Sequence, residues 1–203
     1  MSKIYIACGL THIPRQFFSD YSNNIHKLAA KLEKSGHTVK YALKHSDPQL
    51  SEVEKPLKPE LCYLWDKNMV EEAQCIVAEA SFPSIGLGIE LQIAANKLIP
   101  IIFLHKDYSI NIAEGVKYTN PDGATHKLQI SDGKISLMAL GLPNVYSIHH
   151  YDSLTDISQD IADDIINMCL RNPIEHGNKV RKSTHYSSKK AVTKAKKTPE
   201  PQN

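Results

Sequence analysis

The chain has 203 residues, of which 41% are hydrophobic and 23% charged, and its formal net charge is +2. This length predicts one domain, or one domain with an appendage, that buries a core without disulfides or structural metals. No apolar run approaches the roughly 20 residues of a membrane-spanning helix, and the first residues lack the pattern of a signal peptide. Four widely spaced cysteines without a CxxC pair favour buried free thiols. We therefore expect a cytoplasmic protein.

The positive charge is concentrated near the C-terminal end. Residues 172–203 carry eight Lys or Arg and two Glu, a net charge of +6, whereas residues 1–171 have a net charge of −4. The basic stretch has no hydrophobic period and cannot bury enough apolar surface to offset its ordering entropy. We expect an α/β domain over 1–171 and a basic, disordered tail over 172–203. The tail either solubilises the chain or contacts a polyanion weakly through its charge.

Apolar runs alternate with amphipathic segments through the first 170 residues. The apolar runs predict strands over 3–8, 38–42, 74–80, 99–104 and 144–148. The amphipathic segments predict helices over 16–35 and 60–73, a helix that follows the tight loop of Pro83, Gly86 and Gly88 and runs to about residue 97, and a helix from a capping box at Ser153 and Asp156 onward. The alternation predicts an α/β fold with a five-stranded parallel sheet in the flavodoxin-like (Rossmann-like) order 2-1-3-4-5, and helices on both faces.

Two segments interrupt this alternation. Residues 43–59 contain three prolines and many charges, which predicts a loop. Residues 107–142 contain the turn dipeptides Asp122-Gly123 and Asp132-Gly133. We expect them to form a small hairpin outside the main sheet, in which 125–130 pairs with 134–139.

The predicted sheet places two loops at one site. In an open parallel sheet, ligands bind beyond the carboxyl ends of the strands, where the strand order reverses. Here this predicts a site between the loop after the first strand and the loop at 81–90. In the second loop, Gly86 and Gly88 let the backbone approach a ligand, and Ser84 is placed to cap the helix or bind an anion. Glu90 is expected in the first helical turn, where the helix dipole favours an ionised carboxylate. It is then either a nucleophile or a surface residue that only complements the dipole.

Three segments carry a resemblance to a known family. In order, spacing and strand–loop–helix setting, Ile4–Gly9, Asp66–Ala73 and Val77–Leu91 resemble the nucleoside 2-deoxyribosyltransferase superfamily. The resemblance is strongest to its branch of 2′-deoxynucleoside 5′-phosphate N-hydrolases. It covers residues 3–105 firmly and 106–150 weakly. It implies an enzyme, either an N-glycosyl hydrolase or a deoxyribosyltransferase, that acts on a nucleotide or nucleoside. The sequence has neither the spacing of a Walker loop nor that of a zinc site, so we expect no cofactor and no metal.

The resemblance also implies site residues. Glu90 corresponds to the nucleophile that attacks the anomeric carbon, Asp66 to the acid/base partner near the base, and Tyr5 to a tyrosine beside both the sugar and the nucleophile. Ser84 corresponds to the serine that binds a 5′-phosphate. Further substrate contacts are expected from Gly9, Thr11, His12, Arg15, Gly86 and Gly88. A residue near Ser109 is expected to reach the site of a neighbouring subunit, so that the chain forms a homo-oligomer, most simply a dimer.

Several alternatives stay open at the level of sequence. Asp66 fits a solvated helix face, Tyr5 fits core packing, and Ser84 fits a plain helix cap. The loop after the first strand, Gly9–Arg15, lacks the glycines of the Gly-Ser-x-Arg-Gly-Gly pattern typical of the phosphate branch. Alternative functions are a non-catalytic nucleotide sensor on the same fold, or a glycohydrolase of NAD or another ribonucleotide. The adjacent His149 and His150 point to opposite faces of a strand, which disfavours a metal pair.

Overall fold

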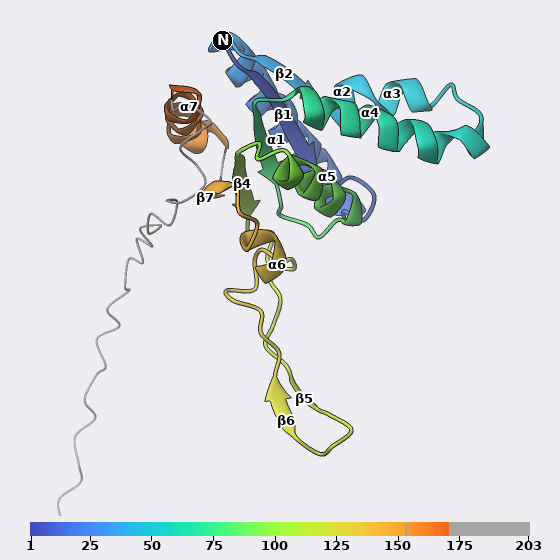
Figure 1. The fold of residues 1–203 in the computed structure, drawn as a ribbon, viewed down its shortest axis with the longest axis vertical. Coiled ribbons are helices and arrows are strands. Elements are labelled where there is room, and N and C mark those ends of the chain that lie inside the picture. The colour runs from blue at the N-terminus through green and yellow to red at the C-terminus, as the bar shows by residue number, and fades with distance from the viewer. Residues whose placement is uncertain (153, 171–203) are drawn as a thin grey trace, which may run out of the picture.

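The computed structural model describes residues 1–152 and 154–170 (Figure 1). The tail predicted over 172–203 lies outside these residues, and so does Ser153 of the predicted capping box. Among the described residues, no helix is both long and apolar enough to cross a membrane.

A five-stranded parallel sheet forms the centre of the molecule (Figure 1). Its strands are β1 (Lys3–Cys8), β2 (Thr38–Tyr41), β3 (Cys75–Glu79), β4 (Ile101–Lys106) and β7 (Val145–Tyr151). They lie in the order β2-β1-β3-β4-β7, which confirms the predicted flavodoxin-like order. β1 and β3 are direct neighbours, in register from Ile4 opposite Cys75 to Cys8 opposite Glu79. The loops that follow these two strands therefore leave the sheet side by side.

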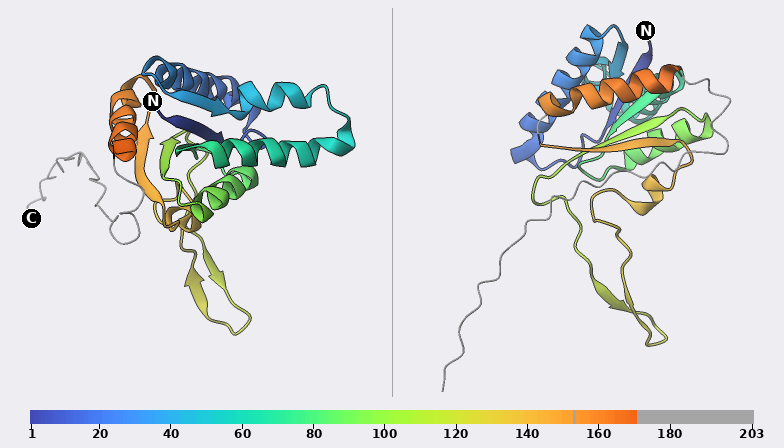
Figure 2. Two further views of the ribbon diagram at one scale, coloured as in Figure 1. Left: turned by 45° about the horizontal axis from the view of Figure 1, so that its top comes forward. Right: turned by 90° about the vertical axis from the view of Figure 1, so that its left-hand side faces the viewer.

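Helices cover both faces of the sheet (Figure 2). α1 (Arg15–Lys34) and α7 (Leu154–Leu170) pack on one face, and α4 (Lys58–Glu72) and α5 (Ile85–Asn96) pack on the other. Alternate residues of β1 divide between the two cores: Ile4, Ile6 and Cys8 face α1 and α7, whereas Tyr5 and Ala7 face α4 and α5. The phenol of Tyr5 is thereby directed to the same side of the sheet as α5.

The segment expected to be a loop over 43–59 is largely helical. It forms α2 (Ala42–His45), α3 (Asp47–Leu50) and a 3₁₀ helix η1 (Lys55–Leu57) before α4 begins. Pro48, Pro56 and Pro59 each occupy one of the first two positions of a helix. Proline is well suited to those positions, because its missing N–H has no helical partner there. The prolines mark helix starts in this segment, and the loop prediction was wrong.

The hairpin outside the main sheet exists, but its strands differ from the predicted ones. β5 (Lys117–Thr119) pairs antiparallel with β6 (Thr125–Lys127) across the Asp122-Gly123 turn. The second dipeptide closes the base of this arm, since the Ala113 N–H donates to the carbonyl of Gly133 at 2.8 Å. Residues 134–139, predicted as a strand, run instead into the short helix α6 (Leu137–Leu140). The hairpin projects away from the sheet (Figure 1).

Candidate active site

A buried hydrogen bond joins the first strand to the helix that follows the third. The phenol of Tyr5 donates to Oε1 of Glu90 at 2.7 Å, and both side chains are buried. Oε2 of Glu90 is also buried and has no hydrogen-bond partner in the described chain. The structure therefore brings together two of the predicted catalytic residues and leaves one carboxyl oxygen of Glu90 unengaged.

Glu90 does not lie where the sequence placed it. α5 begins at Ile85, so Glu90 falls in its second turn and not in the first. Burial raises the pKa of Glu90 to about 8; the Tyr5 hydrogen bond opposes this rise, and the charge of Asp66 adds to it. Two expectations were therefore wrong: the dipole does not keep this carboxyl readily ionised, and Glu90 is no surface residue.

Asp66 lies on α4 at the same side of the sheet. It is half-buried, and its charge raises the pKa of both Tyr5 and Glu90. Burial raises the pKa of Asp66 itself, while hydrogen bonds from Ser46 and Cys62 oppose the rise. The site thus combines a second carboxylate with the Tyr5–Glu90 pair, and Asp66 is not a freely solvated helix-face residue.

The two loops at the strand ends are in contact. A Cβ on Gly9 would lie 2.5 Å from the Cβ of Ser84, so no other residue fits at position 9 without movement. Ser84 caps α5, because its Oγ accepts the Leu87 N–H at 3.3 Å. The capping role named as the structural alternative for Ser84 is thus present. An anion-binding role at the same helix start is compatible with it.

Two glycines leave the start of α5 open. A Cβ on Gly88 would have nothing within 4 Å, and one on Gly86 would meet only the Ser84 Oγ, at 3.7 Å. Packing inside the chain therefore requires neither glycine. Because Gly86 and Gly88 have no side chains, there is room for a ligand beside the first turn of α5.

The remaining predicted contacts of the first loop are on the surface. Thr11, His12 and Arg15 are all exposed. The Arg15 guanidinium lies 5.8 Å from the centre of the Phe18 ring, on its own helix. Of the three, His12 lines a groove together with Ser84 and Gly88.

Ser109 lies apart from the Tyr5–Glu90 pair. It has a left-handed φ of 65° and lines a shallow depression with Phe17 and Asp20 of α1. Its Oγ donates to the Tyr108 carbonyl at 2.6 Å. The sequence placed Ser109 at the site of a neighbouring copy, so its position in one chain does not bear on that prediction.

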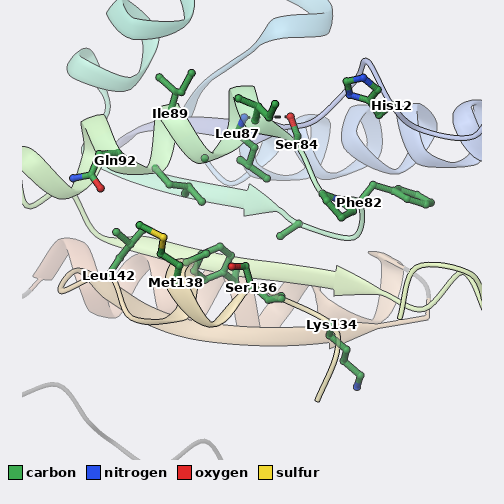
Figure 3. Close-up of a pocket in the computed structure, with 18 residues that line it drawn as sticks. His12, Phe82, Ser84, Leu87, Ile89, Gln92, Lys134, Ser136, Met138 and Leu142 are labelled. Atoms are coloured by element: carbon green, nitrogen blue, oxygen red, sulfur yellow. Dashed lines mark hydrogen bonds between the residues drawn. The ribbon is translucent and has the colours of Figure 1, made fainter. Parts of the chain in front are cut away.

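A groove of about 670 Å³ runs along α5 on a side that Glu90 does not line (Figure 3). Its walls are α5 and the segment that contains α6, and most of its lining is apolar. His12 and Ser84 lie near one end, and Leu142 lies toward the other (Figure 3). Three large apolar side chains beside it are strongly exposed: Ile85 at 81%, Ile89 at 47% and Met138 at 85%.

Sequence reasoning missed the residues that support the site. Ser46 and Cys62 hydrogen-bond to Asp66, and Glu79 accepts hydrogen bonds from the Ser81 and Tyr151 hydroxyls beneath the loop that leads to α5. Glu79 and Ser81 lie inside the family-like segment, but nothing in their spacing identifies their partners.

His149 and His150 lie within β7, and their side chains point to opposite faces as expected. His149 pairs with Asp164 of α7 at 2.7 Å, whereas the ring of His150 contacts His105 at a centroid distance of 5.6 Å. Their side chains thus lie on opposite faces. Within 1–152 and 154–170, no group of three or more His, Cys, Asp or Glu side chains is arranged to hold a metal ion.

The sequence relatives of the chain described below share one name. No protein-family model matches the chain. A protein of Thermofilum pendens named "Putative 2′-deoxynucleoside 5′-phosphate N-hydrolase 1" is 36% identical over 81 residues, which span 40% of this chain and 55% of that protein. A protein of the same name from Syntrophotalea carbinolica is 29% identical over 138 residues, 68% of this chain and 79% of the relative.

A solved structure supports the fold. The 2-deoxyribosyltransferase of Bacillus psychrosaccharolyticus aligns with a TM-score of 0.50 at 16% identity, over 80% of this chain and 96% of that one. This likeness concerns the α/β architecture alone. Together with the sequence relatives, it confirms the resemblance: the chain is similar in sequence to proteins named putative 2′-deoxynucleoside 5′-phosphate N-hydrolase, and it has the α/β fold of a 2-deoxyribosyltransferase.

Proposed function

We propose that the chain is an N-glycosidase that cleaves the base–sugar bond of a 2′-deoxynucleoside 5′-monophosphate, with Glu90 as the nucleophile. The observation that carries this proposal is the buried Tyr5–Glu90 hydrogen bond beside a second carboxylate, Asp66. A pair of carboxyl groups is the usual equipment for glycosidic cleavage through an oxocarbenium-like transition state. The names of the sequence relatives point to the same reaction.

In the first step, the ionised carboxylate of Glu90 attacks C1′ of the sugar. The C1′–N bond breaks, its electron pair goes to the base, and the Asp66 carboxyl supplies the proton that the leaving base needs. Tyr5 holds one oxygen of Glu90 through its hydroxyl, so that the unengaged oxygen is the attacking one. The products of this step are a neutral base and a glycosyl ester of Glu90.

In the second step, water attacks C1′ of the ester. The Asp66 carboxylate accepts a proton from the water, and the C1′–O bond breaks to release the carboxylate of Glu90. The sugar phosphate leaves, and both carboxyl groups return to their starting forms. If a second base replaces water as the acceptor, the same intermediate gives deoxyribosyl transfer.

The 5′-phosphate belongs at the start of α5. The first N–H groups of a helix lack helical acceptors and attract anions. The room beside Gly86 and Gly88 lets a phosphate approach those groups, and the exposed His12 at the neighbouring loop adds a polar contact. The Ser84 hydroxyl, which accepts the Leu87 N–H, retains its own proton for donation to a phosphate oxygen.

The proposed enzyme is a homodimer. The exposed Ile85 and Ile89 of α5 and Met138 of α6 border the apolar groove, and they are costly to leave in water as a contiguous patch. A second copy of the chain would cover them.

The test is direct detection of released base. The protein is incubated with deoxynucleoside 5′-monophosphates, their nucleosides, the corresponding ribonucleotides and NAD, and free base is measured by chromatography. We expect base and deoxyribose 5′-phosphate in equal amounts from at least one deoxynucleotide. Adding a different free base separates transfer from hydrolysis. Tight nucleotide binding without base release from any substrate contradicts the proposal and favours the sensor.

A further inference from the structure

Both oxygens of the Asp66 carboxylate are held by neighbouring side chains. The Ser46 hydroxyl donates to Oδ1 at 3.2 Å, and the Cys62 thiol donates to Oδ2 at 3.6 Å. We propose that Ser46 and Cys62 are positioning residues that fix the orientation of Asp66 for proton exchange with the leaving base. The inference rests on the function proposed above, and it assigns a task to two residues that have none there.

Ser46 is buried and hydrogen-bonded through its backbone. It joins α2 to α3, is only 2% exposed, and its backbone N–H bonds to the Ala42 carbonyl at 2.9 Å. Its Oγ also lies 3.3 Å from that carbonyl, so the hydroxyl proton sits between two acceptors on a fixed backbone. Because an ionised acceptor binds a hydroxyl more strongly than a neutral one, Asp66 is the preferred partner whenever it is charged.

Cys62 reaches Asp66 through helix geometry. The two residues are four positions apart on α4, so their side chains are neighbours on the helix surface. Burial, followed by the charge of Asp66, raises the pKa of Cys62 to about 11. The thiol is therefore protonated at neutral pH and acts as a donor, although a weak one.

The two contacts fix the orientation of the carboxylate but do not use all of its hydrogen-bond acceptor positions. An ionised carboxylate has about four lone-pair positions, so each oxygen keeps a position for the substrate. Rotation of the group would break both contacts at once. The titratable groups coupled to Asp66 are Glu90 on α5, Tyr5 and Cys8 on β1, and Cys62 on its own helix.

Removing either donor should change both the rate and its pH dependence. Ser46→Ala should lower kcat about tenfold, the loss typical of one hydrogen bond to a charged group, and leave KM within about twofold. Cys62→Ala should have a smaller effect, and Cys62→Ser should restore the rate because it keeps a donor. Loss of a donor also destabilises the ionised form of Asp66, so the alkaline limb of the pH–rate profile should move to higher pH. Ser51→Ala is the matched control, because that hydroxyl bonds to the Pro48 carbonyl at 2.7 Å in the same segment and is exposed.

A double-mutant cycle separates positioning from a structural role. In an Asp66→Asn background, Ser46→Ala should cause no further loss of kcat, because its effect passes through the carboxylate. The same loss in both backgrounds would overturn the inference.

A second readout needs no activity. The carboxyl carbon of Asp66, labelled with ¹³C and identified by comparison with Asp66→Asn, is titrated by NMR in the wild type and in both alanine variants. We expect its pKa to rise in Ser46→Ala and in Cys62→Ala. An unchanged pKa overturns the positioning role whatever the enzyme does. A raised pKa together with no base release from any nucleotide upholds the contacts and contradicts only the proposed function.

Discussion

Gly9 and Ser84 are packed so closely that a Cβ on the glycine would lie 2.5 Å from the Cβ of the serine. This contact joins the loops after β1 and β3, two adjacent interior strands of the sheet. Since Ser84 is the N-cap of α5, the backbone at Gly9 limits where that helix begins. The position of Glu90, six residues further along, follows from it.

Gly9→Ala should therefore destabilise the chain. The added methyl group must displace Ser84, and overpacking of this kind costs about 1–3 kcal/mol. Gly88→Ala is the control: its methyl group meets nothing within 4 Å, and the change should stabilise α5 by about 0.5–1 kcal/mol. Urea unfolding at one pH measures both. Equal free energies of unfolding for the two variants would show that the Gly9–Ser84 contact is not tight in solution.

Glu90→Gln should abolish turnover and preserve the fold. Loss of the attacking oxygen should reduce kcat by 10²-fold or more, in line with the removal of other key catalytic groups. The amide oxygen still accepts the Tyr5 hydroxyl, so nucleotide binding measured by calorimetry should persist. The control is Glu72→Gln, an exposed glutamate that pairs with Lys40 at 2.9 Å. Wild-type rates from Glu90→Gln would remove Glu90 from the mechanism.

Sequence reasoning placed the residues of the site better than it described their environment. The family resemblance placed Tyr5 beside the nucleophile, and the hydrogen bond from its hydroxyl to Glu90 agrees with that placement. The ionisation state of Glu90 was not predictable, because it depends on burial by surrounding elements and not on the local helix dipole. Burial raises the pKa of Glu90, whereas the helix dipole was expected to favour the ionised form.

The contacts of Asp66 were missed for a different reason. Ser46 lies 20 positions away in a segment whose prolines suggested a loop. The prolines in fact mark helix starts. The short helices of this segment bring Ser46 next to α4, which a loop prediction could not show. The strands of the hairpin were mispredicted because either Asp-Gly dipeptide fits a hairpin turn. The sequence alone does not show which of the two lies between paired strands.

The pH dependence of base release should follow Glu90. The nucleophile must be ionised, and burial holds its pKa near 8. Ionisation of Glu90 should therefore make kcat/KM rise by up to about tenfold per pH unit on the acid limb, and loss of the Asp66 proton gives the alkaline limb. Asp66→Asn removes the adjacent negative charge, so the rise in its residual activity should occur at lower pH. A rate profile of both proteins from pH 5.5 to 9.5 measures this; a flat wild-type profile between pH 6 and 8 would contradict the assignment.

The same buried carboxyl should reduce stability as the pH rises. Between the usual pKa of 4.5 and about 8, folded chains keep a proton on Glu90 that unfolded chains have released. The free energy of unfolding therefore falls with increasing pH in this window, by about 1.4 kcal/mol per unit of pKa difference. Glutamine does not titrate. The free energy of unfolding of Glu90→Gln, relative to that of the wild type, should therefore increase between pH 5 and pH 8 by on the order of 3–5 kcal/mol. Urea unfolding at several pH values measures the gain, with Glu72→Gln expected to stay parallel to the wild type. Parallel curves for Glu90→Gln would mean that Glu90 is solvated.

The last prediction concerns the exposed apolar side chains beside the groove. Met138 is 85% exposed on α6, across the groove from Ile85 and Ile89 of α5. If a second copy covers this surface, Met138→Glu places a charge in the interface without a partner, which is strongly unfavourable once water is excluded. The wild type should sediment at twice the 22.7 kDa chain mass at micromolar concentration, and Met138→Glu should sediment as a single chain. Leu57→Glu is the matched control, because Leu57 is 50% exposed on η1, away from the groove, and its variant should remain dimeric. A wild type that is monomeric at all concentrations would refute the dimer, and a Met138→Glu variant that still dimerises would place the interface elsewhere.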